Sequence, residues 1–431
     1  MINNDEYLKI TKQMDKGWRV IDENRVPFLR KVLSWLDNPD QQYKIIHIAG
    51  TNGKGSTGEM LNQILQASGY RVGKFSSPGL YTHREQIMVD STYISSNEFV
   101  TEFNKILVIL KQHALDIQAL SFFEWWVIIA LDFFATQELD IAIIEVGVGG
   151  ELDATNAITT SIVNIFTKIA LDHQNILGDS LGAIAEAKCG ILRPGAHVIS
   201  YSGQQAEVQA IIEKRAQIIG AKIYHGPRPK ITSYKVTPAG TNVKIDDDAE
   251  VFLSLGGQFQ LLNLNTVLQT INVLRELEYV ISTAAIKQGL GQARLPGRME
   301  YDAKNNIIRD AAHNPDGIEA LVASLKSWRL PFKPTVILGI LRDKNYITML
   351  ETLLPHVARV IAITPANPTR SLTADELAAQ ILEMDDNVEV SVADDPTAAI
   401  TVARQIRESS DAMIVITGSF YTLRAVKGIK F

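Results

Sequence analysis

HIAGTNGKGST, residues 47–57, connects an apolar run to a helical pattern. The apolar run, residues 43–49, is typical of a buried strand, and apolar residues at helical spacing follow the turn. Three glycines therefore fall in a strand-to-helix turn, where backbone N–H groups can close on an anion at the positive end of the helix. Lys54 adds a point charge, and Ser56 or Thr57 adds a hydroxyl for magnesium. We interpret this turn as a cradle for a triphosphate.

The turn departs from the usual phosphate-loop pattern G-x-x-x-x-G-K-[ST] at two positions. That pattern requires Gly at position 48 and Ser or Thr at position 55, whereas the sequence has Ile48 and Gly55. A glycine-rich turn with a chance lysine is therefore an alternative interpretation. The variant AGTNGKGST nevertheless resembles the phosphate loop of the Mur ligase superfamily, whose members use ATP to join a carboxylate to an amine. The resemblance implies an ATP site made of Gly50, Thr51, Asn52, Gly53, Lys54, Gly55, Ser56 and Thr57.

Composition excludes several other classes of protein. A length of 431 residues suggests two or three domains, and 46% hydrophobic with 21% charged residues is typical of a soluble globular enzyme. The net charge of −6, without a long Lys/Arg block, gives no footprint for nucleic acid or an anionic membrane. The lone Cys189 excludes an intramolecular disulfide and a cysteine-based zinc site. The polar start has no apolar signal region, so we expect a cytoplasmic protein.

A second informative stretch, SSPGLYTHREQI at residues 76–87, follows a short predicted strand. Ser-Ser-Pro is often only a turn, but the carboxyl ends of strands are where α/β sheets build binding sites. The pattern S-S-P-x-L-x-x-x-x-E-x-I resembles the corresponding stretch of folylpolyglutamate and dihydrofolate synthases, which implies that Ser77 binds magnesium. Gly79 and Gln86 stand where many relatives have His and Arg, so we expect an altered folate contact.

The stretch EVGVGGELDATN, residues 145–156, places an acid at the end of another apolar predicted strand. Such an acid can bind a metal directly or through water, or it can cap a helix or face solvent. The whole string resembles the second signature of the same synthases. The resemblance implies that Glu145 binds magnesium and that the glycines let the chain approach the pterin and phosphates.

A further predicted strand, residues 161–166, leads to His173. A lone histidine is more often structural than a ligand, but here it follows a third strand of parallel type. The family resemblance brings Ser77, Glu145 and His173 together around one cation. Magnesium prefers oxygen ligands, so the histidine suggests tolerance for manganese. The cofactors implied are ATP and two Mg²⁺ ions, with metal ligands Ser56, Ser77, Glu145 and His173.

Lys188 lies in IAEAKCGI, residues 184–191, on a predicted helix that ends at Gly190. An isolated lysine on a helix usually faces solvent. In the family that the sequence resembles, the lysine of I-A-x-x-K-x-G-I is carbamylated, and Lys188 matches it. Ala187 stands where relatives often have Glu, so we expect a supporting contact to be missing. The alternative is a cation that pairs with substrate phosphate.

The stretch LGGQFQLLN, residues 255–263, resembles the family's G-x-H-Q-x-x-N pattern, with Phe259 in place of His. Gln260 and Asn263 keep amide groups that could read adenine, whereas core packing is the simpler interpretation of the leucines. The region before this stretch contains a predicted strand, a helix and a small β extension with turns at Pro227, Pro229 and residues 246–248.

Glycine and proline concentrate around residues 289–300, where we place a boundary between domains 1–295 and 296–431. P-G-R-x-E resembles the family's hinge, which implies that Arg298 reaches ATP phosphates or ribose. Strands and helices then alternate, which predicts a second doubly wound α/β domain with a mostly parallel sheet. Asp310 and His313, in DAAHNP, are implied at the nucleotide and glutamate side of a cleft between the domains.

The predicted fold is α/β, with an N-terminal P-loop ATPase-like domain, which has a parallel sheet and a small β extension, and a Rossmann-like C-terminal domain. The resemblance implies a cytoplasmic, monomeric folylpolyglutamate synthase, which could also be a dihydrofolate synthase. ATP would convert a folate carboxylate to an acyl phosphate, and the amine of L-glutamate would attack it. A Mur ligase for a cell-wall precursor and a P-loop NTPase regulator are the alternatives. The catalytic residues implied are Lys54, Lys188, Asp310 and His313.

Overall fold

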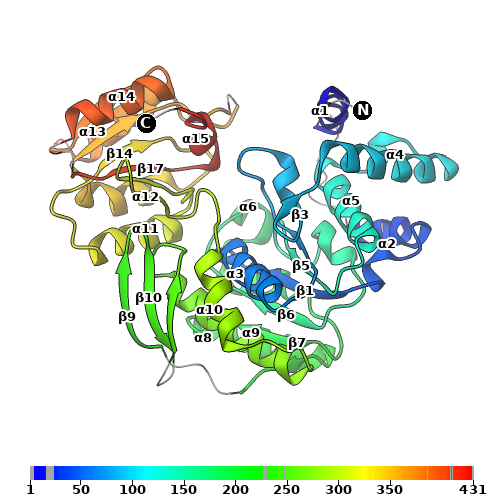
Figure 1. The fold of residues 1–431 in the computed structure, drawn as a ribbon. Coiled ribbons are helices and arrows are strands. Elements are labelled where there is room, and N and C mark those ends of the chain that lie inside the picture. Colours follow the sequence, from blue (N-terminus) through cyan, green and yellow to red (C-terminus); the bar gives the residue numbers. More distant parts are fainter. Residues whose placement is uncertain are drawn as a thin grey trace. The chain divides into compact units, whose positions relative to one another are not determined.

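The computed structural model shows two compact units, which are described separately (Figure 1). The first unit comprises Met1–Pro229 and Leu262–Leu290, and the second comprises Lys230–Leu261 and Gly291–Phe431. The structure describes residues 4–15, 24–226, 231–245, 249–367, 369–385, 387–407, 409 and 411–429. Within these residues, we find no helix that is both long and apolar enough to cross a membrane.

The described part of the first unit is built on one eight-stranded sheet, in the order β4-β3-β2-β5-β1-β6-β7-β8. The strands from β2 to β8 in this order run parallel, whereas β3 and β4 are antiparallel additions at one edge. β1 is flanked by β5 and β6, so three successive parallel strand ends lie next to each other at the centre. The strands are β1 Lys44–Ala49, β2 Val72–Phe75, β3 Ile87–Val89, β4 Thr92–Tyr93, β5 Ile141–Glu145, β6 Val163–Phe166, β7 His197–Ser200 and β8 Lys222–Ile223.

Both faces of the central strands are covered, which explains their nearly continuous apolar sequences. Side chains that alternate along β1 pack on opposite layers: Ile48 lies near Gly58 of α3, whereas Ile45 belongs to the core under α1, α2, α4 and α5. The latter four helices gather on one side of the sheet (Figure 1). The helices are α1 Asn4–Asp15, α2 Val26–Trp35, α3 Lys54–Ala67, α4 Ser96–Gln112, α5 Phe122–Thr136, α6 Gln174–Leu177, α7 Leu181–Cys189, α8 Ala206–Ile219, α9 Gln260–Glu276 and α10 Thr283–Gln292.

Two adjacent serines lie at the start of α4, and Ser95 rather than Ser96 caps the helix. The Ser95 hydroxyl accepts a hydrogen bond from the backbone N–H of Glu98, and the Glu98 carboxylate accepts one from the N–H of Ser95. This reciprocal capping box satisfies two backbone donors, which a cap one residue later would leave open.

A buried acid pair joins α4 to α5. Glu102 and Asp132 are almost fully buried, and Lys105 donates a 2.8 Å hydrogen bond to Asp132. Burial, followed by the hydrogen bond to Asp132 and its charge, raises the pKa of Glu102 to about 8. Burial beside a second acid thus favours the protonated form of Glu102 in the fold at neutral pH.

We expect Glu102→Gln to become more stable relative to the wild type as pH rises. A raised carboxyl pKa gives stability that is complete below the unfolded pKa of about 4.5 and is lost as pH climbs toward about 8. The amide keeps a donor at every pH, so the difference in melting temperature should grow by roughly 2–5 °C between pH 5 and pH 9, as measured by calorimetry. Glu213→Gln, an exposed change on α8, is the control and should show no such trend.

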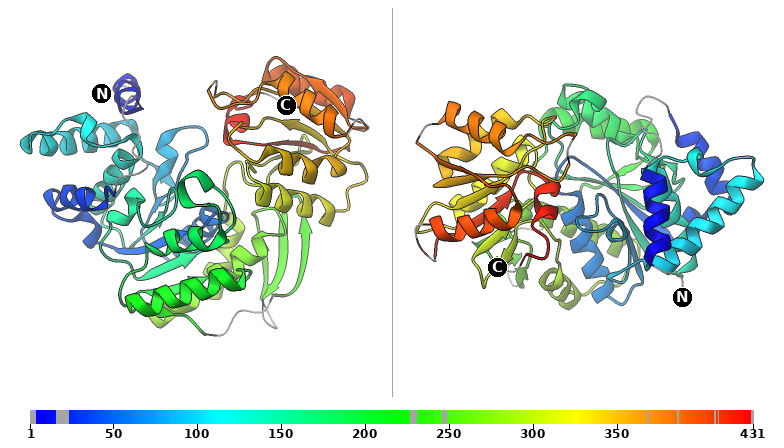
Figure 2. Two further views of the ribbon diagram at one scale, coloured as in Figure 1. Left: turned by 180° about the vertical axis from the view of Figure 1, so that it is seen from behind. Right: turned by 90° about the horizontal axis from the view of Figure 1, so that it is seen from above.

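The described part of the second unit contains two sheets. An antiparallel sheet has the order β11-β10-β9, and a six-stranded sheet has the order β12-β13-β17-β14-β15-β16 with β12 antiparallel to the rest. α11, α12 and α13 share one hydrophobic core with the larger sheet, and the buried residues of α14 do not belong to that core (Figures 1 and 2). The elements are β9 Ile231–Thr237, β10 Gly240–Ile245, β11 Ala249–Leu253, β12 Glu300–Asp302, β13 Ile307–Arg309, α11 Pro315–Ser327, β14 Thr335–Leu338, α12 Tyr346–Leu353, β15 Arg359–Ala362, α13 Ala374–Met384, β16 Glu389–Val392, α14 Pro396–Ile406, β17 Ile414–Thr417 and α15 Phe420–Ala425.

The predicted fold class, an α/β protein with two parallel-type sheets and a small β extension, is confirmed. The compact units assign that extension differently from the predicted domain limits, because residues 230–261 group with the second unit although they fall inside the predicted domain 1–295. The predicted turns at Pro227, Pro229 and residues 246–248 lie outside the described residues.

Candidate functional site

The phosphate loop follows β1 directly and requires glycine at two positions. Gly50 and Gly53 have φ angles of +154° and +93°, which side chains rarely adopt. A Cβ at Gly50 would lie 1.9 Å from Thr167 Oγ1, and one at Gly53 would lie 2.5 Å from Asn263 Oδ1. The loop therefore needs glycine for backbone conformation and for close approach of its neighbours.

The loop is tied to the segment that follows β6. The backbone N–H groups of Thr51 and Asn52 donate to the carbonyl of Lys168, at 2.8 and 3.2 Å. The Thr51 hydroxyl donates to the carbonyl of Ala170 at 2.9 Å and accepts from its N–H at 3.1 Å. The loop that carries Lys54 is thus held against the chain that leads to His173.

Lys54 opens α3 and lies over its own loop. Its ammonium group donates to the carbonyls of Gly50 and Thr51, at 3.1 and 3.4 Å, and lies 4.0 Å from Glu145 Oε1. Two hydroxyls follow it on the first turn of α3: Ser56 and Thr57 are both buried. Thr57 Oγ1 has no hydrogen-bond partner among the described residues. A buried orphan hydroxyl beside a cationic loop fits a bound anion or metal better than it fits a closed apolar core.

Glu145 ends β5 and is brought to the phosphate loop by strand pairing. It stands opposite Ile48 of β1 in the parallel register, and the next residue, Val146, donates its N–H to the carbonyl of Ile48 at 2.9 Å. Its carboxylate is buried, with 7% of the residue exposed. A buried carboxylate near Lys54, at the end of a central strand, can hold a magnesium ion or its water ligands.

The other predicted metal ligands lie on neighbouring loops. Ser77 is partly buried and precedes Pro78 through a cis peptide bond, in a loop where the Glu85 carboxylate accepts backbone N–H groups from residues 80–82. His173 is also partly buried, has a left-handed backbone with φ +50°, and its Nε2 lies 3.9 Å from Asp172 Oδ2. Within the described ranges, three or more His, Cys, Asp or Glu side chains are nowhere grouped as a metal site.

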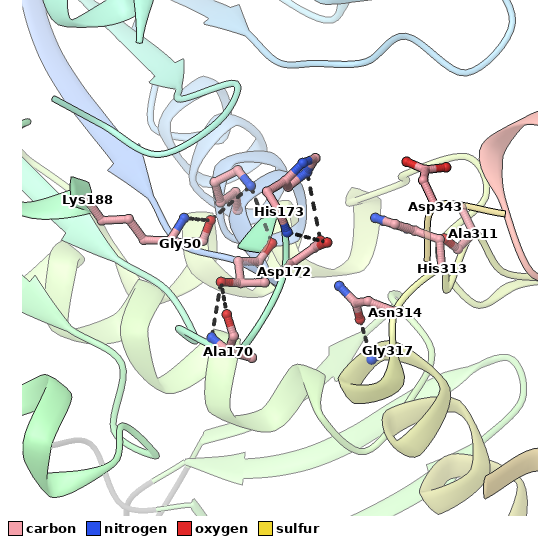
Figure 3. Close-up of polar contacts among 12 residues, drawn as sticks. Gly50, Ala170, Asp172, His173, Lys188, Ala311, His313, Asn314, Gly317 and Asp343 are labelled. Atoms are coloured by element: carbon pink, nitrogen blue, oxygen red, sulfur yellow. Dashed lines mark hydrogen bonds and ion pairs between the residues drawn. The ribbon is translucent and has the colours of Figure 1, made fainter. Parts of the chain in front are cut away.

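Lys188 is buried and points at the phosphate loop, as Figure 3 shows. Its Nζ donates to the carbonyl of Gly50 at 2.9 Å. Burial and the positive charge of Lys54 lower the pKa of Lys188 to about 7, although Asp172 and Asp153 act in the opposite direction. The neutral amine of Lys188 is therefore far more accessible near pH 7 than that of an ordinary lysine.

The glycine-rich loop after β5 packs directly on the helix that carries Lys188. Glu151 donates its N–H to the carbonyl of Ala187 at 2.8 Å, and a Cβ at Gly150 would lie 2.7 Å from the Lys188 carbonyl oxygen. The absence of side chains at the loop glycines thus lets Glu145 and Lys188 belong to one tightly packed site in the first unit.

In the second unit, Asp310 directly follows β13 and holds the segment that carries Arg298. Its two carboxylate oxygens accept backbone N–H groups from Met299 and Ala312, at 2.8 and 2.9 Å. Burial raises the pKa of Asp310, while Arg298 and these N–H donors partly offset the increase. The Arg298 guanidinium lies 4.6 Å from the ring centroid of Phe420. Asp310 therefore fixes the backbone beside Arg298, and this role was not apparent from the sequence.

His313 and its neighbours occupy further strand ends of the six-stranded sheet. The Nδ1 of His313 lies 2.8 Å from the carbonyl of Ala311, so this nitrogen carries a proton that it donates. Asn314 caps α11 by accepting the N–H of Gly317, and Figure 3 shows these groups and Asp343. Asp343 pairs with Arg370, and although burial raises the pKa of Asp343, this partner brings it below the usual range.

Gln260 and Asn263 both lie at the start of α9 and are buried, with 0% and 3% of the residue exposed. Asn263 belongs to the first unit and packs against Gly53, whereas Gln260 belongs to the second unit. Adenine recognition by this pair stays a prediction.

Sequence reasoning missed three groups of the first unit that the structure brings together. His47 stands in the opening motif but had no assigned role, and it contacts Thr155, which contacts Asp153. Two signals were available in the sequence. His47 is a polar residue within an apolar strand, and Asp153 and Thr155 are polar residues within the string DATN. Asp172 was also missed, although it directly precedes His173.

Comparison with known proteins extends this description. Two family models match the chain, the Mur ligase middle domain over residues 48–271 and the Mur ligase glutamate ligase domain over residues 297–420. The folylpolyglutamate synthase of Lacticaseibacillus casei is 32% identical over 407 residues, which cover 92% of each protein. A solved structure of Mycobacterium tuberculosis folylpolyglutamate synthase complexed with ADP matches with a TM-score of 0.89, 27% identity and 98% coverage of both chains. Escherichia coli FolC in complex with DHPP and ADP matches with a TM-score of 0.81, 29% identity and coverage of 97% of this chain and 96% of that one.

A phosphate loop on a parallel sheet, together with a separate glutamate-ligase domain, defines an ATP-dependent ligase of the Mur superfamily. The two family models support this class over residues 48–271 and 297–420. Within the superfamily, the chain belongs to the folylpolyglutamate synthase and dihydrofolate synthase family, and it ligates glutamate to folates or dihydropteroate.

Proposed function

We propose that the protein extends tetrahydrofolate with L-glutamate through an acyl phosphate, and that it also accepts dihydropteroate. The observation that carries this proposal is the phosphate loop, in which Lys54 lies beside the buried Glu145 and Lys188. The γ-phosphoryl group of ATP passes to the substrate carboxylate, and ADP leaves. The amine of glutamate then attacks the acyl carbon and expels phosphate, so an amide forms without a protein nucleophile.

In this mechanism the first unit supplies the charge that meets the phosphates. The N–H groups at the start of α3 surround the anion, and Lys54 turns from the carbonyls of Gly50 and Thr51 toward the transferred phosphoryl group. Positive charge fixed at this position offsets the negative charge that develops in the transition state.

The donor set of the first unit fits magnesium. Ser56, Ser77 and Glu145 offer oxygen atoms and His173 offers a nitrogen, while the orphan hydroxyl of Thr57 lies in the same turn as Ser56. When bound, magnesium would neutralise charge on the phosphate oxygens. The ring nitrogen of His173 is compatible with manganese as well.

The second unit supplies binding groups for ATP and glutamate in this proposal. Arg298 is held in place through Asp310 and stacks on Phe420, so a fixed guanidinium is available for phosphate or ribose. His313, whose Nδ1 proton is fixed by the Ala311 carbonyl, lies at the same sheet edge and is assigned to glutamate.

A ligation assay tests the proposed function. Purified protein, ATP and magnesium are combined with tetrahydrofolate, dihydropteroate or a cell-wall nucleotide precursor, each with L-glutamate, and the products are identified by mass spectrometry. We expect ADP release to depend on both the folate and glutamate. Activity confined to the cell-wall precursor, or ATP hydrolysis independent of any amine, would contradict the proposal.

We expect Glu145→Ala and His173→Ala to raise the metal concentration needed for half-maximal activity and to lower kcat by about 10²-fold. The reason is that metal neutralisation acts mainly in the transition state. Magnesium titrations of ligation rate measure both effects. Glu207→Ala, an exposed change on α8, is the control, and unchanged metal dependence in both site variants would remove them from the metal site.

A further inference from the structure

His47 is an unexpected residue for the middle of a central strand. It is fully buried in β1, three residues before Gly50, and its Nδ1 has no hydrogen-bond partner among the described residues. An orphan polar atom in an apolar core costs free energy, so an apolar residue would be the better choice for stability alone. The other ring nitrogen must therefore have a use that offsets this cost.

That use is a chain of hydrogen bonds to Asp153. His47 Nε2 lies 3.0 Å from Thr155 Oγ1, which lies 2.6 Å from Asp153 Oδ1. Both oxygens of Asp153 already accept backbone N–H groups, from Thr155 to Oδ1 and from Val148 to Oδ2. Asp153 is thus the acceptor from the Thr155 hydroxyl, whose single proton is used there. The hydroxyl can then only accept from His47, which fixes the Nε2–H tautomer.

The charge state of the His47 ring agrees with a hydrogen bond donated by Nε2 to the Thr155 hydroxyl. Burial, followed by the positive charge of Arg193, holds the pKa of His47 well below its usual range. The ring is therefore neutral and has one N–H, which is the number that the chain requires. Neutral imidazole also explains why the orphan Nδ1 is tolerated, since it lacks a proton that would need an acceptor.

This chain of hydrogen bonds connects the two sides of the glycine-rich loop, residues 145–156. Asp153 binds Val148 on one side and Thr155 on the other, and a Cβ at Gly147 would lie 3.0 Å from Asp153 Oδ2. This loop begins at Glu145 and contacts the Lys188 helix through Glu151. The strand that carries His47 continues into the phosphate loop. His47 therefore links the conformation of the loop of residues 145–156 to the strand from which the phosphate loop begins.

We propose that His47 is a positioning residue for ligation, acting through Thr155 and Asp153 to hold the loop of residues 145–156 against the phosphate loop. His47 itself touches neither substrate nor phosphate in this proposal. Its contribution is the fixed direction of the Thr155 hydroxyl, which keeps Asp153 aimed at both ends of the loop. This proposal rests on the proposed function only in the experiments that measure the rate of ligation.

Three substitutions of His47 separate positioning from packing. His47→Gln places an amide nitrogen near the position of Nε2 and can donate to Thr155, whereas His47→Asn reaches only the position of Nδ1, and His47→Leu removes all polar atoms. We expect kcat/KM to fall by about 10–100-fold in the Asn and Leu variants, mainly through kcat, and to stay within about threefold of the wild type for Gln. ADP affinity and melting temperature provide the control for folding.

A double-mutant cycle and a tautomer measurement complete the test. His47→Leu combined with Thr155→Val should lose no more activity than the worse single variant, because both break one chain. Nitrogen NMR of labelled histidine should show a neutral Nε2–H ring for His47 between pH 5.5 and 8, and this readout does not depend on activity. Additive losses, equal defects in the Gln and Leu variants, or an Nδ1–H ring would each overturn the proposal.

Discussion

Lys54→Ala should lower kcat/KM for ligation by at least about 10³-fold while leaving the fold intact. Lys54 is the lysine of the phosphate loop. Its ammonium group contacts two carbonyls of that loop and lies 4.0 Å from the Glu145 carboxylate. Its loss removes charge compensation in the transition state and leaves the carboxylate of Glu145 to repel the phosphates. Ligation rate and ADP affinity measure these effects, and circular dichroism and the melting temperature report on the fold.

The control is Lys44→Ala, which removes an exposed lysine at the start of the same strand and should keep wild-type activity. A second variant, Lys54→Arg, keeps the charge on a larger planar group and tests whether a compact point charge is needed. Near wild-type turnover of Lys54→Ala would remove the phosphate loop from the mechanism.

Lys188→Ala should lower ligation by about 10²–10³-fold, and short carboxylates such as acetate or propionate should restore part of the activity. The proposed reason is carbamylation: the neutral amine adds to CO₂, forms an N–C bond and releases a proton. The amine has the required neutral form because its pKa is lowered to about 7. The product is an anion close to Lys54, so the cation that disfavours an ammonium at Lys188 favours the carbamate.

The carbamate keeps one N–H, which can still donate to the carbonyl of Gly50, and it offers two oxygens to a metal. The ¹³C NMR signal of the Lys188 carbamate, formed in the presence of labelled bicarbonate, should decline below about pH 7, where the ammonium form prevails. The ligation rate should decline over the same range. Lys214→Ala, an exposed change on α8, serves as the control. A bare ammonium at Lys188 in an active, metal-loaded crystal would end the idea and favour a cation that pairs with phosphate.

Most of the fold was predictable because apolar periodicity and turn chemistry agree along the chain. The run ending at Ala49 and the alternation after residue 306 give strands and helices close to those observed. The grouping of residues 230–261 was not predictable in the same way, since it depends on packing between distant segments. The cap of α4 could not be assigned from the sequence, because the adjacent Ser95 and Ser96 offer the same hydroxyl and only the backbone geometry selects Ser95.

The candidate site was predictable where a short string carries its own geometry, as at Lys54 and Glu145. Strand order places those two side chains 4.0 Å apart, and a reader of the sequence can anticipate this from parallel strands that end at one edge. The lowered pKa of Lys188 was not predictable, because it results from burial and from the charge of Lys54 across the fold. The chain of hydrogen bonds from His47 to Asp153 was equally hidden, since His47 is 108 positions from Thr155 in the sequence.

The bonds between the phosphate loop and residues 168–170 also affect how nucleotide binding is driven. A loop of glycines that was loose before binding would have to surrender its backbone entropy when it closed on an anion, at roughly 1–2 kcal/mol for each residue. Here Thr51 and Asn52 are already fixed by the carbonyl of Lys168, and Thr51 exchanges two further hydrogen bonds with Ala170. Much of that ordering is therefore completed during folding, and attraction to the phosphates can appear as affinity.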